Sequence, residues 1–250
     1  TKVWEIPEAS RQSRGKAIVN FLAMGPNEKV NAVLTYNEKS LKEKGTEKYF
    51  VMATKNGVIK KTPIVDFGSV RRSGLIAIKL KKDDSLKWVK ASSGEDQIIF
   101  ITAQGQAIKF SEKDTRPLGR ATAGVIGMRL RKDDEVIGMD VIDTALAKDP
   151  NAKLLVIMEN GFGKKTFLKF YKKQRRGGSG VKTAKITAKT GKIVSAFAIL
   201  PETKEIIAIS KKGVVIRTDL KSISTVSRVT QGVRIMRVEP GDKVVSATLL

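Results

Sequence analysis

The segment Gln174–Gly180, with the sequence Gln-Arg-Arg-Gly-Gly-Ser-Gly, has the residue types in this chain that best suit a phosphate ligand. Three glycines in four residues let the backbone approach a phosphate closely, and Arg175 and Arg176 add bidentate, permanently charged donors. The segment lies within residues 160–201, which hold 11 Lys or Arg and no acidic residue. A plainer interpretation is a flexible glycine loop with solvated arginines.

Basic residues recur at similar places along the chain, several of them just before a glycine. We expect them to contact the same extended phosphate ligand as the glycine-rich segment. Within that segment the candidates are Gln174, Arg175, Arg176, Gly177, Gly178, Ser179 and Gly180. Outside it they are Lys164, Lys165, Lys182, Arg14, Lys16, Arg71, Arg72, Arg116, Arg120 and Arg228.

The composition supports a polyanionic partner and excludes much enzyme chemistry. The 250 residues include 48 Lys and Arg against 25 Asp and Glu, a formal net charge of +23, and neither His nor Cys. Such a charge fits nucleic acid, or an anionic membrane. The membrane is disfavoured, because no apolar run approaches the ~20 residues of a spanning helix. Without His or Cys, the usual triads, thiolate zinc sites and disulfides are impossible, so we expect no catalytic and no metal residues.

Two glycine-centred patterns repeat along the chain and must position these residues. In the first, an apolar run leads through a short turn into a strand that carries basic residues. Its glycines are Gly57, Gly105, Gly161 and Gly213. In the second, a basic loop ends in a glycine and an apolar strand follows. Its glycines are Gly15, Gly74, Gly124, Gly180 and Gly232. The spacing, near 50 residues, predicts repeated small sheets.

The repeats predict an all-β, propeller-like disc of about five four-stranded blades forming one domain over residues 1–250. The expected units cover residues 1–36, 49–90, 97–142, 153–199 and 205–250. The chain begins in the middle of a repeat, and Val244–Ala247 is expected to be the first strand of a further unit. Alternatively, the two ends of the chain pair and complete the fifth blade.

The acidic pairs Asp83-Asp84 and Asp133-Asp134 are the best carboxylate candidates for a metal or an acid–base pair. They recur at one position of the repeat, which Pro240-Gly241-Asp242 matches at the end of the chain. A turn explains this recurrence better than catalysis does.

The chain resembles the C-terminal domain of the A subunit of bacterial DNA gyrase over essentially its whole length. The resemblance rests on Glu8–Asn20, on the hairpin from Asn56 to Thr62, and on Gln174–Gly180, which is similar to the family's seven-residue box Gln-Arg-Arg-Gly-Gly-Lys/Arg-Gly. It implies a β-pinwheel whose blades exchange strands with their neighbours. It also implies that the domain wraps double-stranded DNA around a basic perimeter and so supports ATP-dependent negative supercoiling.

Two departures from the family pattern affect the box. Ser179 stands where a basic residue is usual, which removes one phosphate contact. The family's principal box normally lies in the first blade, whereas Gln174–Gly180 lies in the fourth expected unit. The first blade is therefore expected to be missing from this chain, and this box is either the principal one or a secondary one.

The resemblance further implies partners and a location. The domain would be inactive alone and would need no cofactor, because ATP and Mg belong to other domains of the enzyme. Its protein partners would be the breakage-reunion domain of the gyrase A protein and the gyrase B protein, in an A2B2 enzyme in the cytoplasm at the nucleoid. The isolated domain is expected to be monomeric. The alternatives are the matching domain of topoisomerase IV and a basic propeller that serves as a protein-interaction platform.

Overall fold

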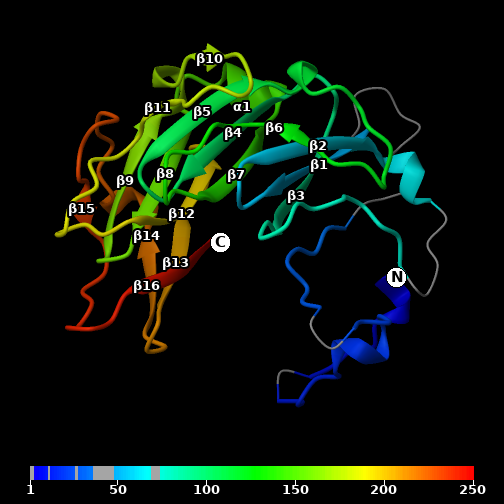
Figure 1. The fold of residues 1–250 in the computed structure, drawn as a ribbon. Coiled ribbons are helices and arrows are strands. Elements are labelled where there is room, and N and C mark those ends of the chain that lie inside the picture. Colours follow the sequence, from blue (N-terminus) through cyan, green and yellow to red (C-terminus); the bar gives the residue numbers. More distant parts are fainter. Residues whose placement is uncertain (1–2, 11, 26–27, 36–47, 69–73) are drawn as a thin grey trace.

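A computed structural model describes residues 3–10, 12–25, 28–35, 48–68 and 74–250. The strands of these residues form four small sheets, here called blades A to D in chain order, which lie side by side around a common centre (Figure 1). The strand order from the inner to the outer edge is β3-β1-β2-β6 in blade A and β12-β8-β9-β15 in blade C. The all-β, propeller-like prediction is confirmed.

Each blade is built on a two-stranded antiparallel hairpin. The hairpins are β1 (Tyr49–Thr54) with β2 (Val58–Pro63), β4 (Gln97–Thr102) with β5 (Gln106–Ser111), β8 (Lys153–Met158) with β9 (Phe162–Phe167), and β13 (Glu205–Ser210) with β14 (Val215–Asp219). Strand β8 is buried at every residue from Leu154 to Met158, because a blade inside the row packs on a neighbour at both faces. Three hydrophobic clusters therefore lie between neighbouring blades, and a smaller one lies within the repeat of blade A.

One strand from each blade lines the centre. These inner strands are β3 (Leu86–Ser92), β7 (Val136–Ile142), β12 (Ile193–Ile199) and β16 (Val244–Leu249). Each contacts the next, β3 with β7, β7 with β12, and β12 with β16. The sheets consequently radiate from this hub, and their opposite edges form the outer rim of the molecule (Figure 1).

The outer edge of blades A, B and C is completed by short strands that come from the following repeat. These outer strands are β6 (Val125–Ile126) on β2, β10 (Lys173–Gln174) and β11 (Val181–Lys182) on β5, and β15 (Val233–Arg234) on β9. Strand exchange between neighbouring blades is thus present. The short 3-10 helices η4 (Ile64–Phe67), η5 (Glu112–Asp114), η6 (Leu168–Phe170) and η7 (Leu220–Ser222) follow the hairpins, and helix α1 (Thr144–Lys148) follows β7.

The structure corrects the expected content of the first and last units. The described residues between 3 and 35 form only the 3-10 helices η1 (Val3–Glu5) and η2 (Ile18–Asn20) and no strand, so the described part of the chain has four sheets rather than five. These sheets have four, five, four and three strands. An exchanged segment becomes a strand only when it pairs with a hairpin edge, and no strand pairing joins these described residues to blade D.

The C-terminal strand is also corrected. Strand β16 pairs with β13 and forms the inner edge of blade D, so it ends that repeat instead of beginning another. Its Ala247 lies opposite Ala208.

The predicted acidic turns are confirmed. Asp83 and Asp133 have φ angles of 63° and 59°, in the left-handed region that Asp tolerates better than most residues. The next residue in each pair holds the hairpin turn of its own blade: Asp84 Oδ1 accepts the amide of Asn56 at 3.0 Å, and Asp134 Oδ1 accepts the amide of Gln104 at 2.9 Å.

Candidate nucleic-acid interface

The glycine-rich segment Gln174–Gly180 forms a loop on the outer edge of blade B, although it belongs to the repeat of blade C. The chain reaches this edge through β10, which pairs in parallel with Lys109 and Phe110 of β5, and leaves through β11, which pairs antiparallel with the same strand. Residues 117–124 and 225–232 make the same excursion on blades A and C, because bridges join Lys61 to Pro117 and Lys165 to Thr225. These three segments are called rim loops below.

The loop is tied to two blades by its main chain and by one arginine. The amide of Gly177 donates to the carbonyl oxygen of Gly127 at 2.8 Å, and the amide of Arg129 donates to that of Gly178 at 3.0 Å. Arg176 donates through Nε to the carbonyl oxygen of Asp114 at 3.1 Å and through a terminal nitrogen to that of Ile126. Arg176 therefore acts as a clamp across the exchanged strand β6, with fewer donors left for a ligand.

Arg228 makes the equivalent contact one blade further on. Both arginines lie four residues before the recurring glycine, Gly180 or Gly232. A terminal nitrogen of Arg228 donates to the carbonyl oxygen of Lys182, in β11, at 3.2 Å. The repetition indicates that an arginine four residues before the recurring glycine links its rim loop to the exchanged strand of the preceding blade.

Gly180 is required by packing rather than by an outside ligand. Its φ is +73°, and a Cβ at this position would lie 2.3 Å from the carbonyl oxygen of Ala107 in β5. Gly232 meets Gly163 of β9 in the same way, at 2.4 Å. The second glycine pattern thus marks the places where an exchanged segment lies against a hairpin edge.

Other box and rim side chains remain available for a ligand. Arg175, Ser179 and Lys182 are exposed, and their side chains make no hydrogen bond or ion pair with any residue that the structure describes. Gln174 is half-buried. Arg175 therefore differs from Arg176, its neighbour in the box, in having its whole guanidinium free.

The structure gives Lys164 and Lys165 a different role from the one expected from the sequence. Lys164 is fully buried, and its Nζ donates to the carbonyl oxygen of Ser227 at 3.0 Å, to that of Arg228, and to Thr230 Oγ1 at 3.2 Å. Burial first, and then the nearby Arg228 charge, lower the pKa of the Lys164 ammonium to about 8. Lys164 therefore holds the next rim loop from inside the molecule. The prediction from the sequence that Lys164 contacts DNA is wrong, because its side chain is buried.

Lys165 belongs to a series that links each blade to the next. The basic residue four positions after the hairpin glycine donates through Nζ to the first carbonyl oxygen of the next repeat's 3-10 helix. Lys61 reaches Glu112 at 3.0 Å, Lys109 reaches Leu168 at 3.5 Å, and Lys165 reaches Leu220. Burial lowers the pKa of Lys165, and the nearby Lys153 lowers it further. Sequence reasoning missed Lys61 and Lys109 as links, although their constant offset from the hairpin glycine was visible.

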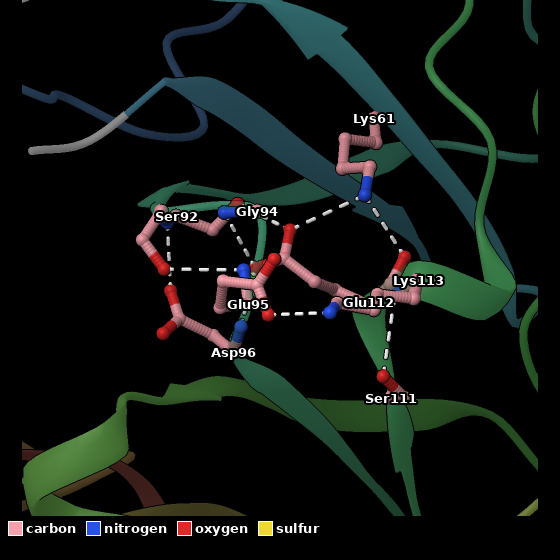
Figure 2. A network of polar contacts seen from close by, with 9 residues as sticks. Lys61, Ser92, Gly94, Glu95, Asp96, Ser111, Glu112 and Lys113 are labelled. Atoms are coloured by element: carbon pink, nitrogen blue, oxygen red, sulfur yellow. Dashed lines mark hydrogen bonds and ion pairs between the residues drawn. The ribbon is translucent and has the colours of Figure 1, made fainter. Parts of the chain in front are cut away.

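At the junction of blades A and B this link is a buried ion pair (Figure 2). The side chain of Glu112 is almost fully buried, and its Oε2 lies 3.5 Å from Lys61 Nζ. Glu112 Oε1 accepts the amides of Asp96 at 2.7 Å and Gly94 at 2.9 Å, and Oε2 accepts the hydroxyl of Ser92 at 2.8 Å. The carboxylate is thus satisfied by the protein, and this cluster is structural.

The remaining candidates are spread along the chain. Arg14 and Lys16 are exposed in the strandless N-terminal part, and Arg71 and Arg72 lie outside the described residues. Arg116 is exposed, whereas Arg120 is half-buried and its carbonyl oxygen accepts Lys60 Nζ. Several candidates thus lie on or next to the rim loops of successive blades, whereas Arg14 and Lys16 lie in the described N-terminal part, which has no strand.

Two other kinds of feature are absent from the described residues. They contain no group of three or more Asp or Glu side chains that is suited to hold a metal ion. They also contain no helix of the length and apolar character needed to span a bilayer.

Comparison with known proteins identifies the family. The sequence model described as "DNA gyrase C-terminal domain, beta-propeller" matches residues 1–37, 48–93, 96–143, 152–199 and 204–250. The DNA gyrase A subunit of Staphylococcus epidermidis is 39% identical over 96% of this chain and 26% of its own length. The corresponding subunit of Mycolicibacterium smegmatis is 38% identical over 98% of this chain and 28% of its own length. The chain thus spans about a quarter of these relatives.

Solved structures show the same architecture. The structure of a DNA gyrase A C-terminal domain superposes with a TM-score of 0.79 at 25% identity, over 95% of this chain and 75% of that one. The C-terminal domain of a DNA topoisomerase IV superposes with a TM-score of 0.83 at 24% identity, over 94% of this chain and 70% of that one. With five matched segments and exchanged strands between blades, this chain belongs to the DNA gyrase C-terminal domain family of β-propellers.

Proposed function

We propose that this domain binds duplex DNA along its outer rim and bends it, as the wrapping part of a DNA gyrase A protein. The observation that carries the proposal is the box loop, which lies on the outer edge of blade B with Arg175 exposed and unpaired among the described residues. The net charge of +23 supplies the electrostatic attraction for a polyanion. Contacts to phosphate make the binding largely independent of base sequence.

Bending is the costly part of this function. Smooth bending of a site of 20 to 30 base pairs by 40° to 90° costs on the order of 1 to 6 kcal/mol. Many phosphate contacts offset this cost. With roughly eight phosphates neutralised, the logarithm of the binding constant falls against the logarithm of salt concentration with a slope of about −7.

The rest of the enzyme follows from the same proposal. The gyrase A protein would contribute an upstream breakage-reunion domain, and the gyrase B protein would supply ATP hydrolysis with Mg in an A2B2 assembly at the cytoplasmic nucleoid. This domain would contribute no catalytic group, and we propose that it is monomeric when isolated.

Ligation of nicked circular DNA in the presence of the domain tests wrapping. A change of linking number in the ligated circles supports it, and an unchanged linking number at saturating protein contradicts it. Replacing Arg175 with Ala should lower the steepness of the salt dependence by about 1. Replacing Lys148, an exposed residue of α1, with Ala is the matched control.

Two other functions predict different results. A topoisomerase IV domain would support relaxation rather than ATP-dependent negative supercoiling when joined to its full enzyme; the gyrase relatives at 39% and 38% identity favour gyrase. A protein-interaction platform would show no affinity for duplex DNA even at low salt.

A further inference from the structure

A second series of basic residues accompanies the outer strands, five positions after the recurring glycine. Each ends a short apolar segment that begins at Gly74, Gly124, Gly180 or Gly232. The series consists of Lys79, Arg129, Lys185 and Arg237. The N-terminal copy of the pattern, which begins at Gly15, has Asn20 instead.

The main chain of three of these four residues is fixed at the place where one repeat meets the next rim loop. The amide of Lys79 donates to the carbonyl oxygen of Thr122, and the amide of Lys185 donates to that of Thr230, each at 3.0 Å. Arg129 makes the equivalent bond to Gly178 of the box loop, also at 3.0 Å. All three acceptors lie two residues before a recurring glycine, so the geometry repeats along the rim.

The side chains of the series are free. All four are exposed, and none makes a side-chain hydrogen bond or ion pair within the described ranges. Other recurring basic residues use their donors on carbonyl oxygens, as Lys165 does on Leu220 and Arg176 on Ile126. At Lys79, Arg129 and Lys185, a backbone fixed by a hydrogen bond carries a cation without a partner among the described residues, which is the arrangement expected of a preformed site for an anionic ligand.

The series follows the outer edge of the molecule. Arg129 comes three residues after β6, Lys185 three residues after β11, and Arg237 three residues after β15. These outer strands succeed one another around the rim (Figure 1). Arg129, Lys185 and Arg237 therefore follow one another along the rim, and the amide of Arg129 is bound to the box loop itself.

We propose that Lys79, Arg129, Lys185 and Arg237 form a phosphate track, with one cation per repeat, that guides the sugar-phosphate backbone of duplex DNA from blade to blade. This inference rests on the proposed function and deepens it. It extends the contact surface beyond the box and assigns the contact to the exposed residues of the exchanged segments rather than to the clamping arginines.

The test compares two variants with the same charge. In the track variant, Lys79→Gln, Arg129→Gln, Lys185→Gln and Arg237→Gln are combined. The control combines Lys87→Gln, Lys148→Gln, Lys204→Gln and Lys221→Gln, four exposed lysines outside the exchanged segments whose side chains have no partner among the described residues. Duplex binding is measured over a range of salt concentrations.

We expect the salt dependence of the track variant to be less steep by about 4, because each phosphate contact contributes about 0.9. The control should lose less than about 1. Equal losses in the two variants would overturn the track while leaving DNA binding intact. Absence of salt-dependent duplex binding by the unmodified domain would instead contradict the proposed function.

Position on the track is tested separately by crosslinking. The chain has no cysteine, so Arg129→Cys and Lys148→Cys each introduce a single thiol that can carry a photoactivated aryl azide. Crosslinking to a bound duplex should be at least about tenfold more efficient from position 129. Similar yields from both positions would count against the track, and thermal unfolding of each protein checks that the substitution leaves the fold intact.

Discussion

The three junctions between blades differ from the two open ends of the row, although all five are built from the same sequence patterns. At the junctions, the hairpin glycine lies against an exchanged segment: a Cβ on Gly57 would lie 2.7 Å from the carbonyl oxygen of Met128, and one on Gly161 would lie 2.0 Å from that of Met236. In the terminal blade D, a Cβ on Gly213 would meet no atom within 4 Å among the described residues.

The opposite end of the row shows the complementary difference. A Cβ on Gly124 would lie 2.5 Å from the carbonyl oxygen of Ile59, whereas one on Gly74 would meet nothing within 4 Å in the described part of the chain. Among the described residues, the segment that begins at Gly74 thus pairs with no hairpin edge, and the hairpin edge of blade D pairs with no exchanged segment. The contacts of each glycine depend on the junction rather than on the motif.

Charged side chains show the same contrast. Lys61, Lys109 and Lys165 each reach a carbonyl oxygen of the next repeat. Arg217, at the same position in blade D, instead donates through Nε to Glu205 of its own hairpin at 2.9 Å. The repeat therefore supplies a basic residue at this position in every blade, and the neighbour determines its partner.

The largest effect is expected from a methyl group at a junction glycine. Gly161→Ala should lower the free energy of unfolding by about 2 to 5 kcal/mol, because it adds left-handed strain and a clash with Met236. Gly213→Ala has only the strain of its φ of +85° and should cost about 1 to 2 kcal/mol. Denaturant unfolding measures both, and equal losses would remove the distinction between junction and end.

A smaller effect should appear in the pH dependence of the junction between blades C and D. The pKa of Lys164 is about 8 in the folded chain, lowered first by burial, against 10.5 as its ordinary value. Between these two pH values the unfolded chain binds more protons, so the stability contributed by this group rises with pH.

The difference between the unfolding free energies of the unmodified protein and of Lys164→Met should therefore grow from about pH 8 to about pH 10.5. Its slope should approach, and not exceed, about 1.4 kcal/mol per pH unit. The equivalent residue of blade D is Ile216, which cannot titrate. A flat difference across this window would mean that burial does not lower the Lys164 pKa.

The links between blades offer a third comparison. Lys165→Met removes the donor to Leu220 and should cost about 1 to 2 kcal/mol, because a carbonyl oxygen at the junction loses its partner. Arg217→Met, at the open end, should leave the unfolding midpoint unchanged, since this exposed pair is screened by solvent. A loss at Arg217 equal to that at Lys165 would indicate that these residues act through the charge of the surface and not as links.

The sequence alone predicts the repeat, the hairpins and the acidic turns, because each depends on residues that are close in the chain. Asn56 and Gly57, for example, predict a turn from their residue types alone, whatever the other blades contain. Which basic residue links blades and which faces solvent depends on contacts between distant parts of the chain, such as that of Lys164 with Ser227, 63 residues later. A lysine that pins a neighbouring loop and a lysine that faces solvent have the same sequence signature, so their roles became distinguishable only in the structure.

The smallest loss of stability is expected in the turns that lie within single blades, where junctions and ends of the row should not differ. Asp83→Ala in blade A and Asp133→Ala in blade B should each cost about 1 kcal/mol, because alanine tolerates φ near +60° less well than Asp does. Replacement by Gly at either position should stay within about 0.5 kcal/mol, since relief of strain offsets the greater freedom of the unfolded chain. Blade A is at an open end and blade B is not, yet both Asp turns hold only their own hairpins. Unfolding measurements that found a clearly larger loss in blade B would show that junctions also stabilise the turns, and that the difference between junctions and ends extends beyond the exchanged strands.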